Sequence, residues 1–195
     1  MSKVALITGS TRGIGKCIAE KFAENGYRVV VTGKTLVDNE KTPGTIYSVS
    51  EEIEKKFNTK TLAGHLNIRK ENHIVDVVNK TYQLFGRIDV LINNAGALWW
   101  DSVLNTPCSK FDLINDINVR GSYLMARECI PHMLKNENGG HIIMHSPPLP
   151  EPTDTSIYKG KAAYMVSKLG MTMAAMGIAE EFRDQNIRVN SIWPQ

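Results

Sequence analysis

The stretch "ITGSTRGIG", residues 7–15, joins a short apolar segment to a helix and decides which fold the chain adopts. The preceding segment, "KVALIT" (3–8), is apolar and β-branched, which is typical of a buried strand. The following "GIGKCIAEKFAENG" (13–26) has apolar residues at helical spacing and closes on Asn-Gly, a helix C-terminal signal. Its glycines let the chain turn tightly between the two elements: Gly9, Gly13 and Gly15. A helix N-terminus offers free N–H groups and a positive dipole end, so the stretch predicts a phosphate-binding turn.

A second phosphate-binding pattern overlaps this stretch and has to be excluded. The segment "STRGIGKC" (10–17) resembles the P-loop pattern G-x-x-x-x-G-K-[ST] of nucleoside triphosphatases. Ser10 stands where the first glycine of that pattern belongs, and Cys17 stands where a hydroxyl would hold Mg²⁺. Because two of the fixed positions fail, we set nucleoside triphosphate hydrolysis aside.

Strands and helices alternate along the whole chain. Apolar, β-branched runs predict further strands at 27–32, within 60–67, and at 87–96, 139–146 and 187–193. Helical patterns fall between them, at about 47–57, 70–85, 109–134 and 161–182. Continuous apolar strands separated by helices favour a parallel sheet that is covered on both faces, and right-handed crossovers make it doubly wound. We therefore expect a three-layer α/β fold with at least six strands, in a single domain over residues 1–195.

Bulk composition narrows the partners and the compartment. The net charge of +3 comes from scattered lysines and arginines, which argues against a nucleic-acid-binding protein. Cys17, Cys108 and Cys129 form no C-x-x-C pair, so we expect reduced thiols in an intracellular, by default cytoplasmic, compartment. Met1 leads directly into the first strand, which leaves no room for a signal peptide. No apolar run reaches the roughly 18 residues of a membrane span, so none is expected.

Further polar motifs fall at the ends of predicted strands. The segment "NNAG" (93–96) ends the fourth strand, and Ser146 ends the fifth. The segment "AAYMVSKLG" (162–170) then opens a helix on which Tyr164 and Lys168, four positions apart, share one face. In the strand order common for this architecture, strands one and four flank the ligand-binding crevice. These motifs predict one crevice at the carboxyl edge, with the tyrosine and lysine either an acid–base pair or a packed phenol beside a solvated ammonium.

Together these motifs resemble the short-chain dehydrogenase/reductase family over the whole chain, with T-G-x-x-x-G-x-G, N-N-A-G and Y-x-x-x-K in order. The segments "GTIYSVSEEIE", "HSPPL" and "MGIAEEF" further resemble its hydroxysteroid dehydrogenase-like members. The resemblance implies a Rossmann-like fold and four catalytic residues: Asn118, Ser146, Tyr164 and Lys168. It also implies dinucleotide contacts from a longer set: Gly9, Ser10, Thr11, Arg12, Gly13, Ile14, Gly15, Lys34, Asn67, Asn94, Ala95, Gly96, Tyr164 and Lys168.

Carbonyl reduction explains why a tyrosine and a lysine belong together. Hydride transfer to a carbonyl carbon leaves negative charge on oxygen, which a proton donor has to neutralise. A free tyrosine, with a pKa near 10, is too weak an acid to serve as a base at neutral pH. A lysine ammonium about 4–5 Å away contributes roughly 3–4 kcal/mol at an effective dielectric of 20, or roughly two to three pKa units. We therefore expect Lys168 to lower the pKa of Tyr164. By resemblance, Lys168 also binds the nicotinamide ribose, Ser146 holds the substrate oxygen, and Asn118 holds a relay water.

Simpler roles stay open for two of these residues. Ser146 could cap its strand, since its distance from Tyr164 along the chain exceeds the family's usual gap, and Asn118 could merely kink a helix. His145 beside Ser146 suggests a hydrolase pair, but neighbours on a strand point to opposite faces and no G-x-S-x-G elbow is present. The remaining histidines show no metal-ligand spacing, so no metal is expected.

The end of the second strand favours NADP(H) over NAD(H). An NAD site places Asp or Glu there to bond the ribose hydroxyls. Here the strand ends "VTGKT", with Lys34 at the position of that acid and Arg12 inside the glycine turn. Both cations can pair with a 2′-phosphate. Asn67 stands where the family usually has an aspartate beside the adenine, and its amide can still form a hydrogen bond.

We therefore expect an NADP(H)-dependent oxidoreductase that interconverts a carbonyl and an alcohol on a small, apolar substrate. Trp99 and Trp100 either line the substrate site or only pack. The alternative is a nucleotide-binding protein with little or no turnover, since in the family a seventh strand and a substrate-covering segment follow the point where this chain ends. There, Pro194-Gln195 replaces the family's Pro-Gly. By resemblance, the helix at 161–182 supports a homo-oligomer, although its methionines equally suit internal packing, and a peroxisomal or mitochondrial location is also compatible.

Overall fold

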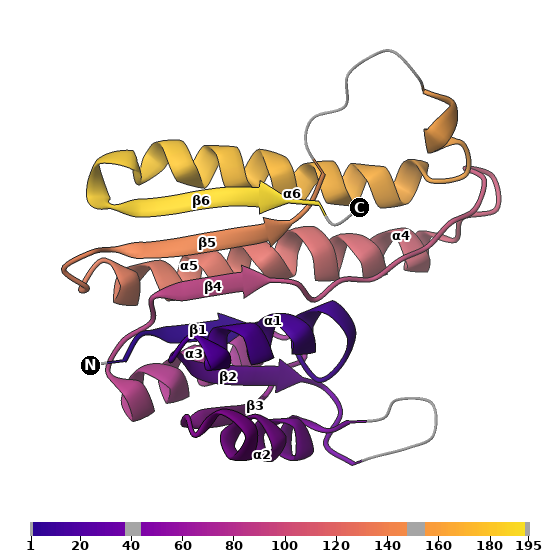
Figure 1. Cartoon of the computed structure of the whole chain (residues 1–195). Coiled ribbons are helices and arrows are strands. Elements are labelled where there is room, and N and C mark those ends of the chain that lie inside the picture. Colours follow the sequence, from indigo (N-terminus) through magenta and orange to yellow (C-terminus); the bar gives the residue numbers. More distant parts are fainter. Residues whose placement is uncertain (1, 38–43, 148–154, 194–195) are drawn as a thin grey trace.

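A computed structural model describes residues 2–37, 44–147 and 155–193. Pro43, residues 148–154 of the proline-rich stretch "PPLPEPTDTSIYKG" (147–160) and Pro194-Gln195 lie outside the described residues. The described chain forms a six-stranded sheet with the order β3-β2-β1-β4-β5-β6 (Figure 1). Every neighbouring pair is parallel. The strands are β1 (Val4–Ile7), β2 (Arg28–Gly33), β3 (Thr61–His65), β4 (Val90–Asn93), β5 (Gly140–His145) and β6 (Ile187–Ile192). The order reverses between β1 and β4, which confirms the predicted doubly wound, Rossmann-like sheet.

Helices cover the two faces of the sheet unequally. They are α1 (Gly13–Glu24), α2 (Ile46–Phe57), α3 (Glu71–Phe85), α4 (Cys108–Asn115), α5 (Ser122–Met133) and α6 (Ala162–Glu181). A π-helical segment η1 (Asp116–Gly121) joins α4 to α5, and short 3₁₀ turns occur at η2 (Ser156–Tyr158) and η3 (Arg183–Gln185). In Figure 1, α1 and α2 lie in front of the sheet, and α3, α5 and α6 lie behind it. The three predicted layers are therefore present.

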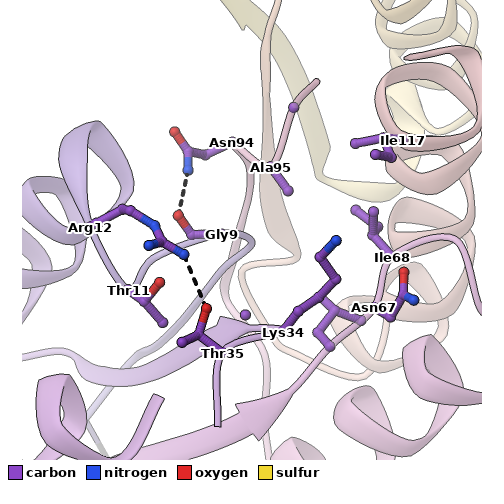
Figure 2. Close-up of a pocket in the computed structure, with 13 residues that line it drawn as sticks. Gly9, Thr11, Arg12, Lys34, Thr35, Asn67, Ile68, Asn94, Ala95 and Ile117 are labelled. Carbon is purple, nitrogen blue, oxygen red and sulfur yellow. Dashed lines mark hydrogen bonds between the residues drawn. The ribbon is translucent and has the colours of Figure 1, made fainter. Parts of the chain in front are cut away.

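Asn94 holds the glycine turn against the end of β4. Its Nδ2 donates to the carbonyl oxygen of Thr8 at 2.9 Å and to that of Gly9 at 3.0 Å, and Figure 2 shows the second of these bonds. In return, the Thr8 hydroxyl accepts from the backbone N–H groups of Asn94, at 3.0 Å, and Ala95, at 2.9 Å. Gly15 makes this approach possible, because a Cβ there would lie 2.4 Å from both Asn94 Nδ2 and the Gly9 oxygen. The turn after β1 and the N-N-A-G turn after β4 therefore fix each other.

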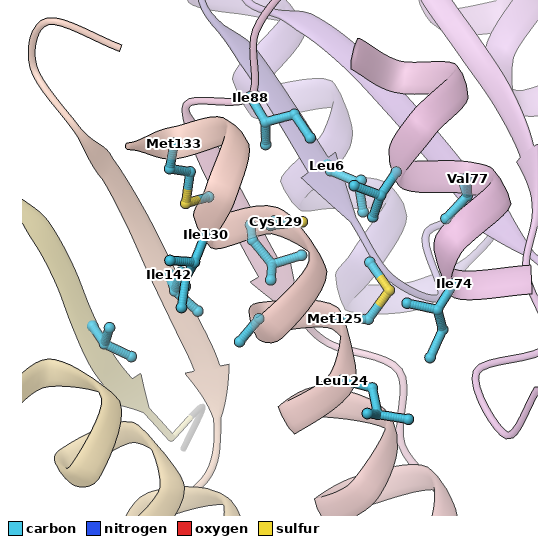
Figure 3. Packing of buried hydrophobic residues seen from close by; sticks show 14 of the residues in the cluster. Leu6, Ile74, Val77, Ile88, Leu124, Met125, Cys129, Ile130, Met133 and Ile142 are labelled. Atoms are coloured by element: carbon cyan, nitrogen blue, oxygen red, sulfur yellow. The ribbon is translucent and has the colours of Figure 1, made fainter. Parts of the chain in front are cut away.

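Alternate residues of each strand feed two hydrophobic cores. In β1, Val4 and Leu6 belong to the larger cluster, which α3, α5 and α6 cover (Figure 3). Ala5 and Ile7 face the smaller cluster under α1 and α2. All four side chains are fully buried. Because side chains alternate along a strand, an apolar strand of this kind contributes to both cores, at about 1.5–3 kcal/mol for each large side chain. The sheet is thus fixed from both sides beneath its carboxyl edge.

The helix that the sequence predicts over 109–134 is divided in the structure. Between α4 and α5, the six residues of η1 are π-helical. Asn118 lies in this segment, fully buried, with its amide bonded to the backbone of Ala97. Local widening of a helix to the π form is frequent at functional sites. The apolar spacing continues through the segment, so periodicity alone gives no sign of the break.

By length and composition, α6 is a candidate membrane span, with a mean hydropathy of 1.2 over its best window. Core helices pass the same test, and α6 contributes Met171, Ala175 and Ile178 to the larger hydrophobic cluster. Among the other helices that the structure describes, none meets the criterion. This candidate membrane span is the same helix that carries Tyr164 and Lys168.

Gly15→Ala should destabilise the fold, because the added methyl would lie 2.4 Å from two polar atoms. We expect the free energy of unfolding to fall by about 1–3 kcal/mol, the usual cost of overpacking. Gly177→Ala is the matched control, since a Cβ at that α6 position meets no atom within 4 Å. The control should be neutral or gain up to about 1 kcal/mol from helix propensity. Urea unfolding measures both, and equal stabilities would contradict the close approach at Gly15.

Candidate active site

Two adjoining cavities lie along the carboxyl edge of the sheet and share Asn94 and Gly96. The first has a volume of about 370 Å³ and the second about 390 Å³. The first is lined by Gly9, Thr11, Arg12, Gly33, Lys34, Thr35, Leu66, Asn67, Ile68, Asn94, Ala95, Gly96 and Ile117. The second is lined by Ile14, Asn94, Gly96, Ala97, Leu98, His145, Ser146, Tyr164, Lys168, Ile192 and Trp193. The predicted crevice is therefore present, in two halves.

The residues of the glycine turn divide between surface and support. Thr11 and Arg12 line the first cavity, whereas Ile14 lines the second. Ser10 is buried, and its hydroxyl donates to the Ile7 oxygen and accepts from the Thr32 N–H, both at 2.9 Å. The predicted cofactor contacts of Ser10, Gly13 and Gly15 stay predictions, since these three residues line neither cavity.

Two cationic side chains line the first cavity. Arg12 Nη2 donates to the Thr35 hydroxyl at 3.1 Å, and Lys34 projects into the same space (Figure 2). Among the described residues that line this cavity, none is Asp or Glu. This half of the crevice therefore suits an anionic group. The sequence motifs do not point to Thr35, which the structure places in the wall of this cavity and bonded to Arg12.

Asn67 lies on the far wall of the first cavity, after β3 (Figure 2). Its Oδ1 accepts from the Arg69 N–H at 3.2 Å, which orients the amide within the turn toward α3. Ile68 beside it adds an apolar surface. An amide next to an apolar wall suits a flat heterocycle, and the contact with adenine stays a prediction.

Tyr164, Lys168 and Ser146 meet in the second cavity, as the sequence predicts. Two come from the first turns of α6 and one from the loop after β5. The ammonium of Lys168 lies 6.0 Å from the centre of the Tyr164 ring and donates to the carbonyl oxygen of His145. The structure thus brings together residues that are separated by a long loop.

The electrostatics of this pair differ from the expectation. Burial raises the pKa of the Tyr164 phenol above its ordinary value, and burial lowers the pKa of Lys168 to about 8. The predicted lowering of the tyrosine pKa is absent, because desolvation of the half-buried phenol dominates and the ammonium is engaged by the His145 carbonyl. Both shifts favour the uncharged forms, so the two groups are held in a poorly solvated part of the crevice.

Ser146 presents an unsatisfied hydroxyl. The residue is 1% exposed, and its Oγ has no hydrogen-bond partner among the described residues. Its backbone N–H bonds to the oxygens of Met144 and Ile192. Because an unpaired buried hydroxyl costs about 1–3 kcal/mol, a ligand oxygen in the second cavity would stabilise it. The hydroxyl therefore does not pair with His145, whose pKa burial lowers.

The Asn118 side chain connects Ala97, which lines the second cavity, to Ser167 on α6. Its Oδ1 accepts from the Ala97 N–H at 2.8 Å, and its Nδ2 donates to the Ala97 oxygen at 3.0 Å and the Ser167 hydroxyl at 2.9 Å. Both amide protons are thereby used. Its role of holding a relay water stays a prediction, and its side chain could accept such a water only on Oδ1.

Trp99 and Trp100 line neither cavity. The ammonium groups of Lys110 and Lys161 lie over their rings, at 4.7 Å and 5.0 Å from the centroids. The tryptophan of the second cavity is Trp193, directly after β6. Its position was foreseeable, because the carboxyl end of β6 lies at the same sheet edge as β5.

The cysteine and histidine side chains of the described residues form no metal-binding group. Cys17 and Cys108 are exposed free thiols and Cys129 is a buried one. Among the residues that the structure describes, no group of three or more His, Cys, Asp or Glu side chains could hold a metal ion.

Comparisons with known proteins agree with this geometry. The sequence model of the short chain dehydrogenase family matches residues 3–195. Hydroxysteroid dehydrogenase-like protein 2 of Danio rerio is 45% identical over 189 residues, which cover 97% of this chain and 44% of the relative. The chain thus spans less than half the length of the curated relatives it matches.

Solved structures show the same arrangement. A metagenomic short-chain oxidoreductase in complex with NADP has a TM-score of 0.84 and 30% identity, over 98% of this chain and 81% of that one. L-Sorbose reductase from Gluconobacter frateurii, complexed with NADPH and L-sorbose, has a TM-score of 0.83 and 28% identity, over 99% and 69%.

Because the pKa of Lys168 is lowered in the folded chain, the difference in unfolding free energy between the wild type and Lys168→Met should depend on pH. Between pH 8 and 10.5 the folded chain binds fewer protons at Lys168 than the unfolded chain, so this group adds stability as the pH rises. Relative to Lys168→Met, the wild type should gain roughly 2–3 kcal/mol between pH 7 and pH 10. Urea unfolding at several pH values measures the difference. A stability difference that does not vary with pH would show that Lys168 titrates as an exposed lysine does.

Proposed function

The chain belongs to the short-chain dehydrogenase family, and from this premise we propose that it is an NADP(H)-dependent oxidoreductase interconverting a carbonyl and an alcohol on a small, apolar substrate. One observation carries the proposal. Tyr164, Lys168 and Ser146 line a single cavity that adjoins the cavity of the glycine turn. A dinucleotide bound along the crevice would reach from one cavity to the other, with its phosphates at the N-terminus of α1.

The second cavity offers the groups that carbonyl chemistry needs. When bound, the nicotinamide supplies or accepts the hydride. Tyr164 donates a proton to the developing alkoxide, or accepts one from the alcohol in the reverse direction. The unpaired Ser146 hydroxyl donates a hydrogen bond to the same oxygen. Lys168 supplies positive charge beside the phenol and a donor for the ribose.

The nature of the cavity wall supports an apolar substrate. Leu98, Ile192 and Trp193 line the second cavity. They combine apolar area with the few polar groups of Tyr164 and Ser146, the usual composition of a small-molecule site.

The preference for NADP(H) follows from the charge of the first cavity. Arg12, Lys34 and Thr35 line this cavity, and none of its described lining residues is acidic. A 2′-phosphate would gain two charged donors there, whereas ribose hydroxyls would find no carboxylate among the described lining residues to accept their hydrogen bonds.

A nucleotide-binding protein with little turnover is the second candidate. The specific observation in its favour is the raised pKa of Tyr164, which makes the phenol a weaker proton donor and leaves less phenolate to act as a base at neutral pH. Nucleotide binding without turnover in a broad panel of aldehydes, ketones and alcohols would select this candidate.

We also propose that the chain associates with a second copy. Several large apolar side chains on α4 and α6 are exposed: Phe111, Val166, Met173 and Met176. Apolar side chains that recur along two neighbouring helices are typical of a surface that another subunit covers.

Tyr164→Phe should abolish turnover and leave cofactor binding intact, because it removes one proton donor and keeps the ring. We expect turnover to fall by at least about 100-fold, the usual contribution of a positioned acid, with the NADPH dissociation constant changing less than about threefold. Tyr123→Phe, which alters an exposed tyrosine on α5, is the matched control. Steady-state rates on a substrate found in the panel give the answer. Retention of most of the rate would remove Tyr164 from the mechanism.

Arg12→Ala and Lys34→Ala should each weaken NADPH binding and spare NADH binding. A charged hydrogen bond contributes about 1.5–3 kcal/mol, so each variant should raise the NADPH dissociation constant by about 10-fold or more. The NADH constant should change by less than about threefold. Lys55→Ala, which removes an exposed lysine paired with Glu51, is the control. Fluorescence titration with both cofactors measures the constants. Equal affinity of the wild type for the two would overturn the preference.

A further inference from the structure

We propose that Ser167 is a positioning residue that fixes the Asn118 amide and, through it, the two walls of the second cavity. The inference rests on the proposed function, since it concerns the geometry of the Tyr164 site. It begins from the position of Ser167, which is fully buried on α6 and precedes Lys168 directly.

The Ser167 hydroxyl is used in both directions. It donates to the backbone oxygen of Tyr164 at 2.7 Å. With its proton engaged, it can only accept from a further partner, and it accepts from Asn118 Nδ2 at 2.9 Å. The hydroxyl thus links the backbone of the Tyr164 turn to η1.

Because the Ser167 hydroxyl can only accept, the Asn118 amide has a single orientation that satisfies its neighbours. The Ala97 N–H requires an acceptor at 2.8 Å, and the Ala97 oxygen requires a donor at 3.0 Å. A reversed amide would place its NH₂ group opposite the Ala97 N–H and its oxygen opposite the Ala97 carbonyl. It would also remove the donor that Ser167 accepts from. In a site with almost no exposure, each such mismatch leaves a polar group unsatisfied.

The two ends of this network are the two walls of the second cavity. Ala97 follows the N-N-A-G turn, Tyr164 and Lys168 belong to α6, and all three line the cavity. Asn118 and Ser167 join these segments by hydrogen bonds, although neither residue lines the cavity itself. The first cavity has no contact with Ser167. Loss of the hydroxyl should therefore loosen the reacting groups and leave most of the cofactor contacts unchanged, since orientation errors affect the chemical step most.

Hydrogen exchange tests the link without a substrate. In Ser167→Ala, backbone amides in peptides covering residues 94–100 and 160–170 should exchange at least about tenfold faster than in the wild type, because their shared network is cut. Ser122→Ala is the matched control: Ser122 is also buried, on α5, but its hydroxyl has no partner among the described residues. Unchanged exchange in Ser167→Ala, or the same change in both variants, would overturn the inference.

Kinetics then separates positioning from general packing. We expect Ser167→Ala to lower kcat at least about tenfold and to change the KM for NADPH less than about threefold. The double variant with Asn118→Ala should be no slower than Asn118→Ala alone, since Ser167 acts through that amide. Additive losses would overturn the inference. A wild type without turnover would reject the proposed function instead, and the exchange result would then decide on Ser167 by itself.

Discussion

The close approach of Asn94 to the turn after β1 is the contact on which the crevice depends. One side-chain amide bonds two consecutive carbonyl oxygens, and one buried hydroxyl, that of Thr8, bonds two consecutive N–H groups in return. The contact leaves no room for a side chain at Gly15. Because it joins the ends of β1 and β4, it fixes the point where the strand order reverses, and both cavities share Asn94 as a wall.

A second set of contacts organises the reacting end of the crevice. Asn118, in the π-helical segment, bonds the backbone of Ala97 on one side and Ser167 on the other. The helix has the wider π-helical form at the position where this buried amide contacts two elements at once. Stability and function are joined here, since the same bonds that satisfy buried polar groups also set the distance between the N-N-A-G turn and the Tyr164 helix.

Burial determines the electrostatic character of Tyr164 and Lys168. It raises the pKa of Tyr164 and lowers the pKa of Lys168 to about 8, so burial favours the neutral phenol and the neutral amine. The unpaired hydroxyl of Ser146 lies in the same poorly solvated space. Charge developing on a substrate oxygen there would meet donors that are already in place, which is the arrangement that lowers a barrier most effectively.

The sequence by itself determined the sheet, its parallel strands and the edge of the sheet at which the candidate site lies. Strand alternation, the glycine turn and the motifs at strand ends are local patterns, and in a parallel sheet the carboxyl ends of strands meet at one edge. Only the tertiary structure decided the rest. The sequence assigned Trp99 and Trp100 no definite role, and the structure puts Trp193 at the cavity instead, because wall residues are selected by what packs beside them. The π-helical break at Asn118, the bond from Ser167 and the direction of the Tyr164 pKa shift depend on contacts between distant segments and on desolvation, which no spacing along the chain encodes.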